Sequence, residues 1–265
     1  MRRSAIVIGG GRGIGAATAT LLAADGHDVT IVDRGADDLR LPYPLASVAD
    51  IERSAAAAKE VATGGEVVGV AADACDEGAI RRVVEEVAAR TGGLDVMVVT
   101  AGVIAGGVPV WELPEAELDA LLDVDLRAVI IAARAGIPAM RRRPEPRAGR
   151  FVAVASAAAH RGLPMLSVYG AAKAGVVGFV RGLAAELRAT GITANTVSPG
   201  STDTAMLVES ARLYALSDAR EFIAHQPIGR LIEPAEIAAV ISFLAGESSG
   251  AITGADHVVD GGLTI

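Results

Sequence analysis

The sequence predicts an α/β protein in which one parallel sheet is covered by helices on both faces. Short runs of β-branched residues recur along the 265 residues, and segments of helical length separate them. These runs are apolar at successive positions, as in strands that are buried on both sides. Alternation of such strands with helices predicts a doubly wound, Rossmann-type sheet.

The strands are expected at residues 5–8, 29–32, 67–70, 96–99, 151–154 and 192–197, with a last strand near 256–259. The helices are expected at residues 14–25, 48–63, 77–91, 115–140, 167–189 and 234–246. The chain has no internal repeat, no low-complexity linker and no break in composition. We therefore expect a single domain that spans residues 1–265.

Composition narrows the class of partner. The formal charge is −8 and the isoelectric point about 5.1, so nothing attracts the chain to nucleic acid or to an anionic membrane. Cys75 is the only cysteine, which excludes an internal disulfide, and we expect no metal site. The opening residues lack the apolar segment of a signal peptide, and the longest uncharged stretch, 96–111, is too short to span a bilayer. We expect a cytoplasmic protein with a small-molecule partner.

A glycine-rich loop follows the first expected strand directly. The segment GGGRGIG places glycines at 9, 13 and 15, and an expected helix begins inside it. Glycine lets the backbone turn sharply and approach a pyrophosphate, while the helix N-terminus offers free N–H groups. A tight turn alone would also use glycine, but the order of strand, loop and helix favours a dinucleotide site.

Asp33 lies eighteen residues beyond Gly15, at the end of the second expected strand. A carboxylate there accepts hydrogen bonds from the adenosine ribose hydroxyls and repels a 2′-phosphate, so it favours NAD over NADP. Arg12 and Arg34 are the argument for NADP, because either could hold that phosphate. A solvent-facing turn aspartate is the alternative interpretation of Asp33.

Three residues form a candidate catalytic set. Tyr169 and Lys173 are four residues apart on an expected helix, so their side chains share one face. Ser156 follows the run at 151–154, at the carboxyl end of a strand, where ligands bind in such sheets. Alcohol oxidation needs a base, and lowering a tyrosine pKa to neutrality takes about 4 kcal/mol, roughly what one ammonium about 4 Å away supplies. Lys173 is one of only two lysines among 24 basic residues. The alternative is a surface tyrosine beside a solvated lysine.

Several motifs together resemble the short-chain dehydrogenase/reductase family over essentially the whole chain. They are GGGRGIG, Asp33, Asp73-Ala74, the TAG at 100–102, SAAAHRGLPMLSVYGAAK and SPGSTDT. Within the family, DDLRLPYPLAS, RPEPRAGRFVAVAS and SPGSTDTAM…HQPIGRL look like the mycofactocin-coupled, NAD-dependent alcohol dehydrogenases. The resemblance implies strand order 3-2-1-4-5-6-7, a homotetramer, and a tightly held cofactor whose electrons leave through mycofactocin.

The resemblance also implies roles for individual residues. Ser156, Tyr169 and Lys173 match the catalytic set, with Asp125 at the position of the family's fourth catalytic residue, an asparagine. Asp73 and Ala74 match residues near the adenine. Tyr169 and Lys173 also count among the cofactor-binding residues. The remaining ones are Gly9, Arg12, Gly13, Ile14, Gly15, Asp33, Arg34, Thr100, Ala101, Gly102, Pro199, Gly200, Thr202 and Thr204.

Three positions depart from the family pattern. Ile8 replaces a threonine and Thr100 an asparagine, so we expect an apolar contact between them in place of a hydrogen bond. Asp125 replaces the asparagine that holds a relay water beside Lys173. A carboxylate there can pair with Lys173 and weaken its influence on Tyr169, which predicts reduced but present activity.

Two insertions and one segment near the C-terminus remain. Residues 36–47, with Pro-Tyr-Pro, are a candidate clamp over the cofactor or a packing surface for a neighbour, and the arginine-rich run 141–150 is a solvated loop or a phosphate-binding patch. Residues 202–226 are expected to form a mobile lid, because apolar residues recur there, or to pack as an ordinary helix. The apolar positions are Met206, Leu207, Val208, Leu213, Tyr214 and Leu216.

Three functions stay open. The first is hydride transfer between NAD and a hydrophobic secondary alcohol or ketone, with Tyr169 as general acid and base. The second is an NADPH-dependent 3-oxoacyl-carrier-protein reductase that uses Arg141 to Arg147 to meet an acidic carrier, although Asp33 argues against it. The third is a non-catalytic NAD-binding protein, which Asp125 makes conceivable. Small residues along 167–189 permit close contact between subunits, so we expect an oligomer.

Overall fold

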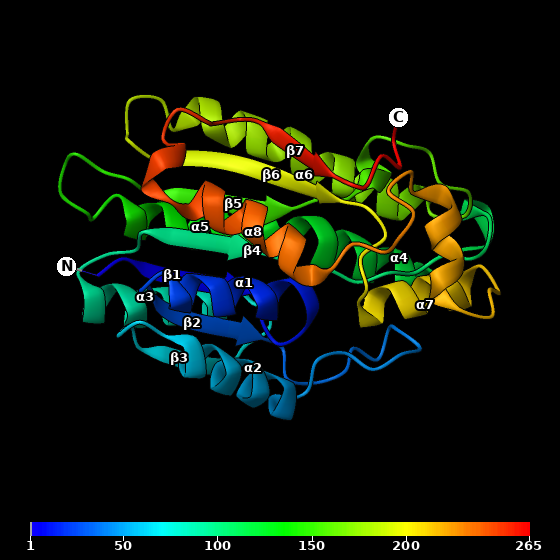
Figure 1. Cartoon of the computed structure of the whole chain (residues 1–265), viewed down its shortest axis with the longest axis horizontal. Helices are drawn as coiled ribbons and strands as arrows, with labels where there is room; N and C mark the ends of the chain where they lie inside the picture. The colour runs from blue at the N-terminus through cyan, green and yellow to red at the C-terminus, as the bar shows by residue number, and fades with distance from the viewer. Residues whose placement is uncertain (1) are drawn as a thin grey trace.

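The computed structural model describes residues 2–265 and contains one seven-stranded parallel sheet between two layers of helices (Figure 1). The strand order is β3-β2-β1-β4-β5-β6-β7, which confirms the predicted topology. The strands are β1 (Ser4–Ile8), β2 (Asp28–Asp33), β3 (Val67–Ala71), β4 (Val96–Val99), β5 (Arg150–Val154), β6 (Thr193–Pro199) and β7 (Asp256–Val259). No helix among residues 2–265 is both long and apolar enough to cross a membrane.

The helices connect consecutive strands. They are α1 (Gly13–Ala24), α2 (Val48–Val61), α3 (Glu77–Thr91), α4 (Glu115–Leu122), α5 (Ala128–Met140), α6 (Ser167–Glu186), α7 (Ala205–Leu213) and α8 (Pro234–Ala245). Short turns of 3-10 helix are η1 (Val110–Glu112), η3 (Ala157–Ala159), η4 (Ala219–His225) and η5 (Glu247–Ser249). Local signals set several ends: Asp76 caps α3 through the Ala79 N–H, and Gly92 ends it in the left-handed conformation.

Two buried clusters hold the layers together. Residues of α1, α2 and α8 pack on one face of the sheet, and residues of α3, α5 and α6 pack on the other. Strands β1, β4 and β5 are buried at every position, which explains their continuous apolar sequences. A third cluster lies beyond the carboxyl ends of the strands and includes Tyr43, Ile104, Tyr169 and Met206. It joins segments that are far apart in the chain.

The prediction of one helix over 115–140 is wrong. A π-helical turn, η2 (Asp123–Arg127), separates α4 from α5, and the Ala128 N–H donates to the Asp123 carbonyl five residues earlier. The turn packs on α6, where Leu126 lies against Gly175: a Cβ on that glycine would be 3.1 Å from a Leu126 methyl group. Single π turns inside α-helices often occur at functional sites. This one carries Asp125.

Candidate active site

A cavity of about 640 Å³ opens at the carboxyl ends of the strands, where the residues of the glycine loop line one wall. Gly9 has a φ of +85°, and a Cβ on it would be 2.3 Å from the Ala101 nitrogen. A Cβ on Gly15 would be 2.1 Å from the Gly9 carbonyl oxygen. The loop therefore needs glycine for close backbone approach, and α1 begins within it at Gly13, so that the first residues of the helix line the cavity.

Asp33 lies at one end of this cavity, at the end of β2. Its carboxylate accepts the Gly11 N–H at 2.9 Å and the Arg34 N–H at 2.8 Å. Burial raises the pKa of Asp33, and these two hydrogen bonds oppose the increase. Arg34 pairs with Asp38 at 2.6 Å and lies 3.5 Å from Asp73, so its positive charge is already engaged by carboxylates. Asp73 and Ala74 line the same end of the cavity.

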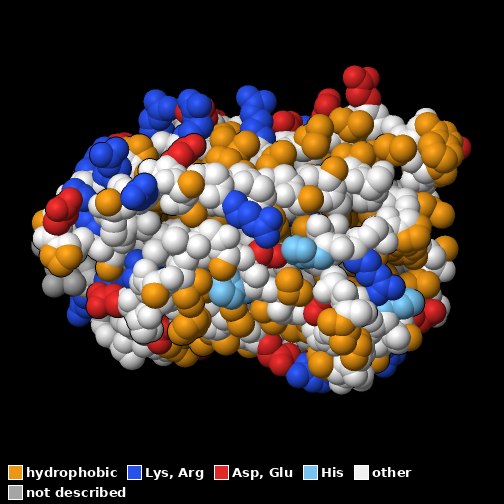
Figure 2. Space-filling model, turned by 90° about the horizontal axis from the view of Figure 1, so that it is seen from above, with side chains coloured by type: hydrophobic (Ala, Val, Ile, Leu, Met, Phe, Trp, Pro, Cys, Tyr) orange, Lys and Arg blue, Asp and Glu red, His pale blue; other side chains and the backbone are white. Residues whose placement is uncertain are grey.

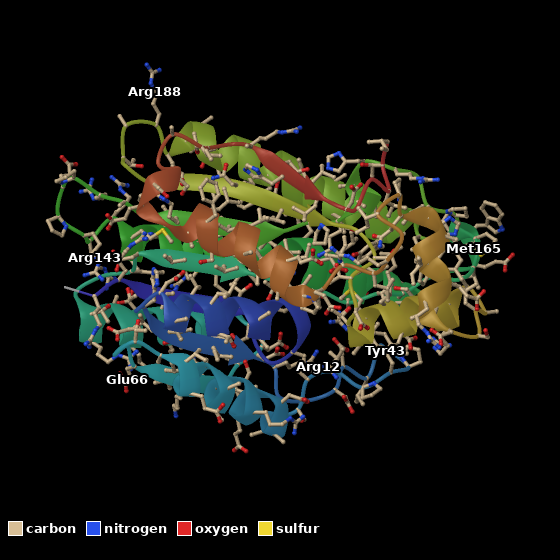
Figure 3. All side chains as sticks on the ribbon, in the orientation of Figure 1. Arg12, Tyr43, Glu66, Arg143, Met165 and Arg188 are labelled. Atoms are coloured by element: carbon tan, nitrogen blue, oxygen red, sulfur yellow. The ribbon has the colours of Figure 1, made fainter. Side chains whose placement is uncertain are left out.

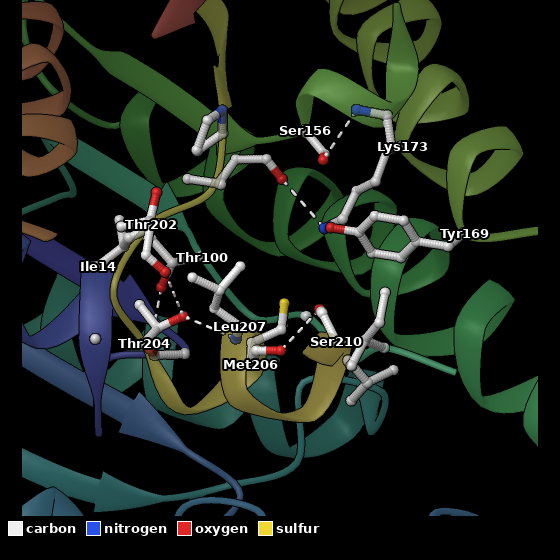
Figure 4. Close-up of a pocket in the computed structure, with 18 of the residues that line it drawn as sticks. Ile14, Thr100, Ser156, Tyr169, Lys173, Thr202, Thr204, Met206, Leu207 and Ser210 are labelled. Carbon is white, nitrogen blue, oxygen red and sulfur yellow. Dashed lines mark hydrogen bonds between the residues drawn. The ribbon is translucent and has the colours of Figure 1, made fainter. Parts of the chain in front are cut away.

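The three candidate catalytic residues meet at the other end of the cavity (Figure 4). Ser156 follows β5 and accepts the Ala158 N–H at 3.1 Å, which fixes its side chain at the start of η3. Tyr169 and Lys173 come from successive turns of α6 and are both buried. The Lys173 Nζ lies 5.8 Å from the centre of the Tyr169 ring. The chain therefore brings together the serine, tyrosine and lysine that the sequence singled out.

Asp125 pairs with Lys173. Its Oδ1 lies 3.1 Å from Nζ and accepts the Val103 N–H at 3.1 Å, while Oδ2 has no hydrogen-bond partner in the described structure. Burial raises the pKa of Asp125, and the charge of Lys173 opposes this. Burial lowers the pKa of Lys173, but the charges of Asp125 and Tyr169 more than offset it, so its net pKa is raised. The geometry matches the pairing that the sequence suggested.

The same pair acts on Tyr169. Burial raises the pKa of Tyr169, the positive charge of Lys173 lowers it, and the negative charge of Asp125 raises it again. A hydrogen bond from Ser156 also lowers it, but the net pKa stays above its ordinary value. In the protein without a bound nicotinamide the pKa of Tyr169 is therefore raised, because burial and, to a smaller extent, the charge of Asp125 together outweigh Lys173 and Ser156.

Residues 36–47, which we name the strap, run from the Asp33 end of the cavity across the segment that follows β4. Asp38 is buried and accepts hydrogen bonds from Arg34 and Arg40, and Arg40 also binds Asp123 at 2.8 Å. The Tyr43 hydroxyl accepts the Ile104 N–H at 2.8 Å. The strap is thus held at both ends, and its residues Leu45 and Ala46 line the cavity.

The expected lid contains α7, a turn at 214–218 and η4. Met206, Leu207, Tyr214 and Leu216 line the cavity, and Leu213 packs in the third cluster, as the sequence suggested. Val208 is different: its side chain is 61% exposed and points to solvent. The Tyr214 hydroxyl donates to the Pro164 carbonyl at 2.7 Å, which joins the segment to the loop before α6. Pro199, Gly200, Thr202 and Thr204 lie beside it on the cavity wall.

The expected apolar contact between Ile8 and Thr100 is wrong. The Thr100 hydroxyl lies 3.0 Å from both the Ile8 and Gly9 carbonyl oxygens, so it donates a hydrogen bond to this turn. Ile8 is buried between strands and needs no polar partner for its side chain. A hydrogen bond from the fourth strand to the first is therefore kept, with a backbone carbonyl as the acceptor.

The arginine-rich run at 141–150 precedes β5 and lies at the end of the sheet opposite the cavity. Figure 3 places Arg143 at one end of the molecule and Tyr43 and Met165 toward the other. Arg142 pairs with Glu85, Arg143 with Asp95 and Arg147 with Glu145. Arg150 is buried and donates to the Gly246 and Glu247 carbonyls. Ion pairs within the chain therefore account for much of this positive charge.

Sequence reasoning missed part of the apolar wall. The loop between Ser156 and Tyr169 contributes Arg161, Leu163, Pro164 and Leu166 to the cavity, and the C-terminal segment contributes Leu263. Arg161 donates to the Leu263 carbonyl at 2.5 Å and so joins the two segments. This loop could have been predicted to line the cavity, because it lies in the sequence between Ser156 and Tyr169. Nothing in the local sequence at Leu263 indicates that it reaches the cavity.

Comparison with known proteins agrees with this geometry. A family model described as enoyl-(acyl carrier protein) reductase matches residues 9–264. The cis-4-hydroxycyclohexanecarboxylate dehydrogenase of Sinomonas cyclohexanicum is 38% identical, over 99% of this chain and 96% of that protein. The crystal structure of levodione reductase aligns with a TM-score of 0.89 at 32% identity, covering 99% of this chain and 97% of the other.

A short-chain dehydrogenase from Mycobacterium paratuberculosis, bound to NAD, aligns with a TM-score of 0.87 at 28% identity and covers 99% of this chain and 97% of its own. The family binds nicotinamide cofactors, and its members among these relatives are dehydrogenases and reductases. With its sheet order, glycine loop and Ser156–Tyr169–Lys173 set, the chain belongs to the short-chain dehydrogenase/reductase family of oxidoreductases.

Proposed function

We propose that this protein is an NAD-dependent dehydrogenase that exchanges hydride with a hydrophobic secondary alcohol or ketone. The observation that carries the proposal is that one cavity contains the glycine loop and Asp33 at one end and Ser156, Tyr169 and Lys173 at the other. A dinucleotide that spans such a cavity brings its reactive ring to the catalytic residues. Oxidoreductase membership of the family supports the reaction class.

The residues of the cavity fit a nicotinamide dinucleotide. Gly13 has a φ of +53°, and its absent Cβ leaves room between the loop and Thr204, where an added Cβ would be 3.1 Å from a methyl carbon. The backbone of the loop and the first turn of α1 would hold the diphosphate. Asp33 would accept hydrogen bonds from the adenosine ribose hydroxyls, and its negative charge disfavours a 2′-phosphate. Because Asp38 and Asp73 already engage Arg34, we propose NAD rather than NADP.

The side chains of the chain supply the proton chemistry. A bound nicotinamide supplies the hydride acceptor or donor. In alcohol oxidation, hydride leaves the carbinol carbon and Tyr169 takes the hydroxyl proton; in ketone reduction, both return. Ser156 donates a hydrogen bond to the substrate oxygen and holds it near Tyr169. Lys173 lowers the pKa of Tyr169, and Asp125 moderates that effect.

The substrate is proposed to be apolar and alicyclic in character. The cavity wall in the cluster that contains Tyr169 is formed by Val103, Ile104, Leu163, Leu166 and Met206. Figure 2 shows apolar side chains at the end of the molecule that carries α7. A hydrophobic wall with a few polar groups selects apolar ligands. The name of the similar cis-4-hydroxycyclohexanecarboxylate dehydrogenase supports an alicyclic alcohol.

Tight retention of the cofactor is the second part of the proposal. The strap lies beside Asp33, and hydrogen bonds of Asp38 and Tyr43 fix it to two other segments. We propose that it slows release of NAD, and that mycofactocin accepts the electrons, as the sequence resemblance implies. We also propose a homotetramer in the cytoplasm. The open positions of Gly178 and Gly182 on α6, where an added Cβ would contact nothing within 4 Å, support close contact between subunits.

The 3-oxoacyl-carrier-protein reductase is the second candidate, and similarity to MabA of Mycobacterium tuberculosis, a protein of that name that is 34% identical over 98% of this chain, favours it. Its proposed basic docking run lies across the sheet from the cavity and is largely ion-paired. This arrangement favours the free alcohol or ketone as substrate. The non-catalytic alternative conflicts with the retention of Ser156, Tyr169 and Lys173 around one cavity.

Absorbance spectra test the proposal. The purified protein is scanned at the wavelength of reduced nicotinamide before and after addition of alicyclic secondary alcohols, with and without added NAD. We expect reduced nicotinamide to appear near 1:1 with enzyme and then to stop. Continuous turnover with free NAD rejects tight retention, and absence of reduction with every alcohol favours the binding protein. Faster reaction with NADPH and an acyl-carrier ketone favours the second candidate.

A further inference from the structure

Asp125 places a buried negative charge directly behind the wall of the cavity. Its side chain is fully buried and lies beside Gly102, which lines the cavity. A Cβ on Gly102 would be 2.9 Å from Asp125 Oδ1 and 3.2 Å from Lys173 Nζ. Oδ1 pairs with Lys173 and accepts the Val103 N–H, whereas Oδ2 accepts no hydrogen bond from a described residue. Because the pair is buried away from bulk solvent, the negative charge of Asp125 offsets the positive charge that Lys173 presents to the neighbouring part of the cavity.

The charge balance of this half of the cavity depends on Asp125. Lys173 and Asp125 together are neutral, whereas an asparagine at 125 would leave a net positive charge. Among the described residues that line the cavity, the carboxylates are Asp33 and Asp73, both beside Arg34 at the far end. Asp125 therefore dominates the negative potential near Tyr169.

We propose that Asp125 makes this site prefer the oxidised nicotinamide to the reduced one, an inference that rests on the proposed function. Hydride is exchanged with the carbon whose oxygen contacts Tyr169, so the nicotinamide ring has to lie beside Tyr169. The oxidised ring carries a positive charge that the reduced ring lacks. A nearby carboxylate attracts the oxidised form selectively, and relative to an asparagine it changes the ratio of the two affinities by about tenfold.

The preference for the oxidised nicotinamide also changes the equilibrium of the bound reaction. A site that binds NAD⁺ more tightly than NADH makes bound NADH a stronger hydride donor, by the same factor. Asp125 therefore shifts the equilibrium among enzyme-bound species toward ketone reduction. It also leaves the resting enzyme with oxidised cofactor, ready for an alcohol.

An exchange experiment measures this preference without turnover. The protein is incubated to equilibrium with a fixed mixture of NAD⁺ and NADH, free nucleotide is removed, and the bound nucleotides are released by denaturation and quantified. The bound ratio divided by the free ratio gives the relative affinity even when exchange is slow. The variants are Asp125→Asn, Asp125→Glu, which keeps the charge, and Asp119→Asn, an exposed control on α4 with the same change in net charge.

We expect Asp125→Asn to shift the relative affinity about tenfold toward NADH, and Asp125→Glu and Asp119→Asn to retain the native ratio. A native ratio in Asp125→Asn, within a factor of two, overturns the inference while leaving the proposed function intact. If Asp125→Asn does not fold, loss of the preference in Asp125→Glu overturns it instead. Absence of binding of either nucleotide to the native chain refutes the proposed function and this inference with it.

Discussion

Replacing Asp125 with asparagine tests whether the Asp125–Lys173 pair limits catalysis. The Lys173 Nζ lies 5.8 Å from the Tyr169 ring centre, which at an effective dielectric near 20 favours the phenolate by about 3 kcal/mol. Asp125 Oδ1 is 3.1 Å from Nζ and so lies at most about 9 Å from that ring centre, where it disfavours the phenolate by about 2 kcal/mol or more. Asp125 thus cancels roughly two thirds of the effect of the lysine.

Removal of this charge lowers the pKa of Tyr169 and raises the ratio of phenolate to phenol by about 30-fold or more at neutral pH. We expect Asp125→Asn to raise turnover in alcohol oxidation by about that factor where proton removal limits the rate. The rising limb of its pH–rate profile moves to lower pH. The assay is single-turnover formation of reduced nicotinamide from pH 6 to 10, with Asp119→Asn as the control.

Unchanged or lower turnover in Asp125→Asn refutes the reasoning. If turnover falls and the pH–rate profile moves to higher pH, the buried Lys173 stays protonated only when the Asp125 carboxylate is present. In that case Asp125 supports catalysis and does not moderate it.

Three further predictions concern the cofactor end and the strap. We expect Asp33→Ser to lower the affinity for NAD by about 10- to 100-fold, because hydrogen bonds to a charged acceptor are lost, and to reduce the ratio of NAD affinity to NADP affinity. Calorimetric titration with both nucleotides measures the two affinities. An unchanged ratio contradicts the role assigned to Asp33. Tyr43→Phe leaves the Ile104 N–H without its acceptor, so we expect bound NAD to leave about tenfold faster in a chase with labelled nucleotide, and an equal release rate excludes the strap as a clamp. Hydrogen bonds from Arg40 hold the pKa of Asp38 well below its usual range, so its contribution to stability is present above about pH 4 and is lost as the pH falls further. Melting temperatures from pH 6 to 2 should therefore converge for the native chain and Asp38→Asn, and a constant difference contradicts the linkage.

Much of the fold could be predicted because its signals are local. Runs such as 5–8 and 96–99 are apolar at every position, and the structure buries them on both faces. The glycine loop and the i, i+4 spacing of Tyr169 and Lys173 also depend on short stretches of chain. Their place around one cavity follows from parallel strands whose carboxyl ends share one edge of the sheet.

The features that could not be predicted depend on contacts between distant residues. Segment 115–140 has helical periodicity throughout, and the π turn within it is accompanied by packing of Leu126 on Gly175 of α6. The hydrogen bond of Thr100 goes to a backbone carbonyl, which no side-chain pattern reveals. Asp38 is buried within the strap because its carboxylate pairs with Arg40. This pairing depends on how the loop folds back on itself, which the sequence does not reveal.

The π turn at Asp123–Arg127 sets the rotation of α5 relative to α4, and this rotation decides which residue faces Lys173. Each residue turns an α-helix by about 100°, so one extra residue in the turn sets the angle between everything before it and everything after it. Deletion of a single residue from this turn would rotate α4 relative to α5 and remove Asp125 from Lys173, without altering any catalytic side chain. In this chain a one-residue change in length is therefore more consequential than most substitutions, and a gap placed at this turn in an alignment would reassign the residue that faces the lysine.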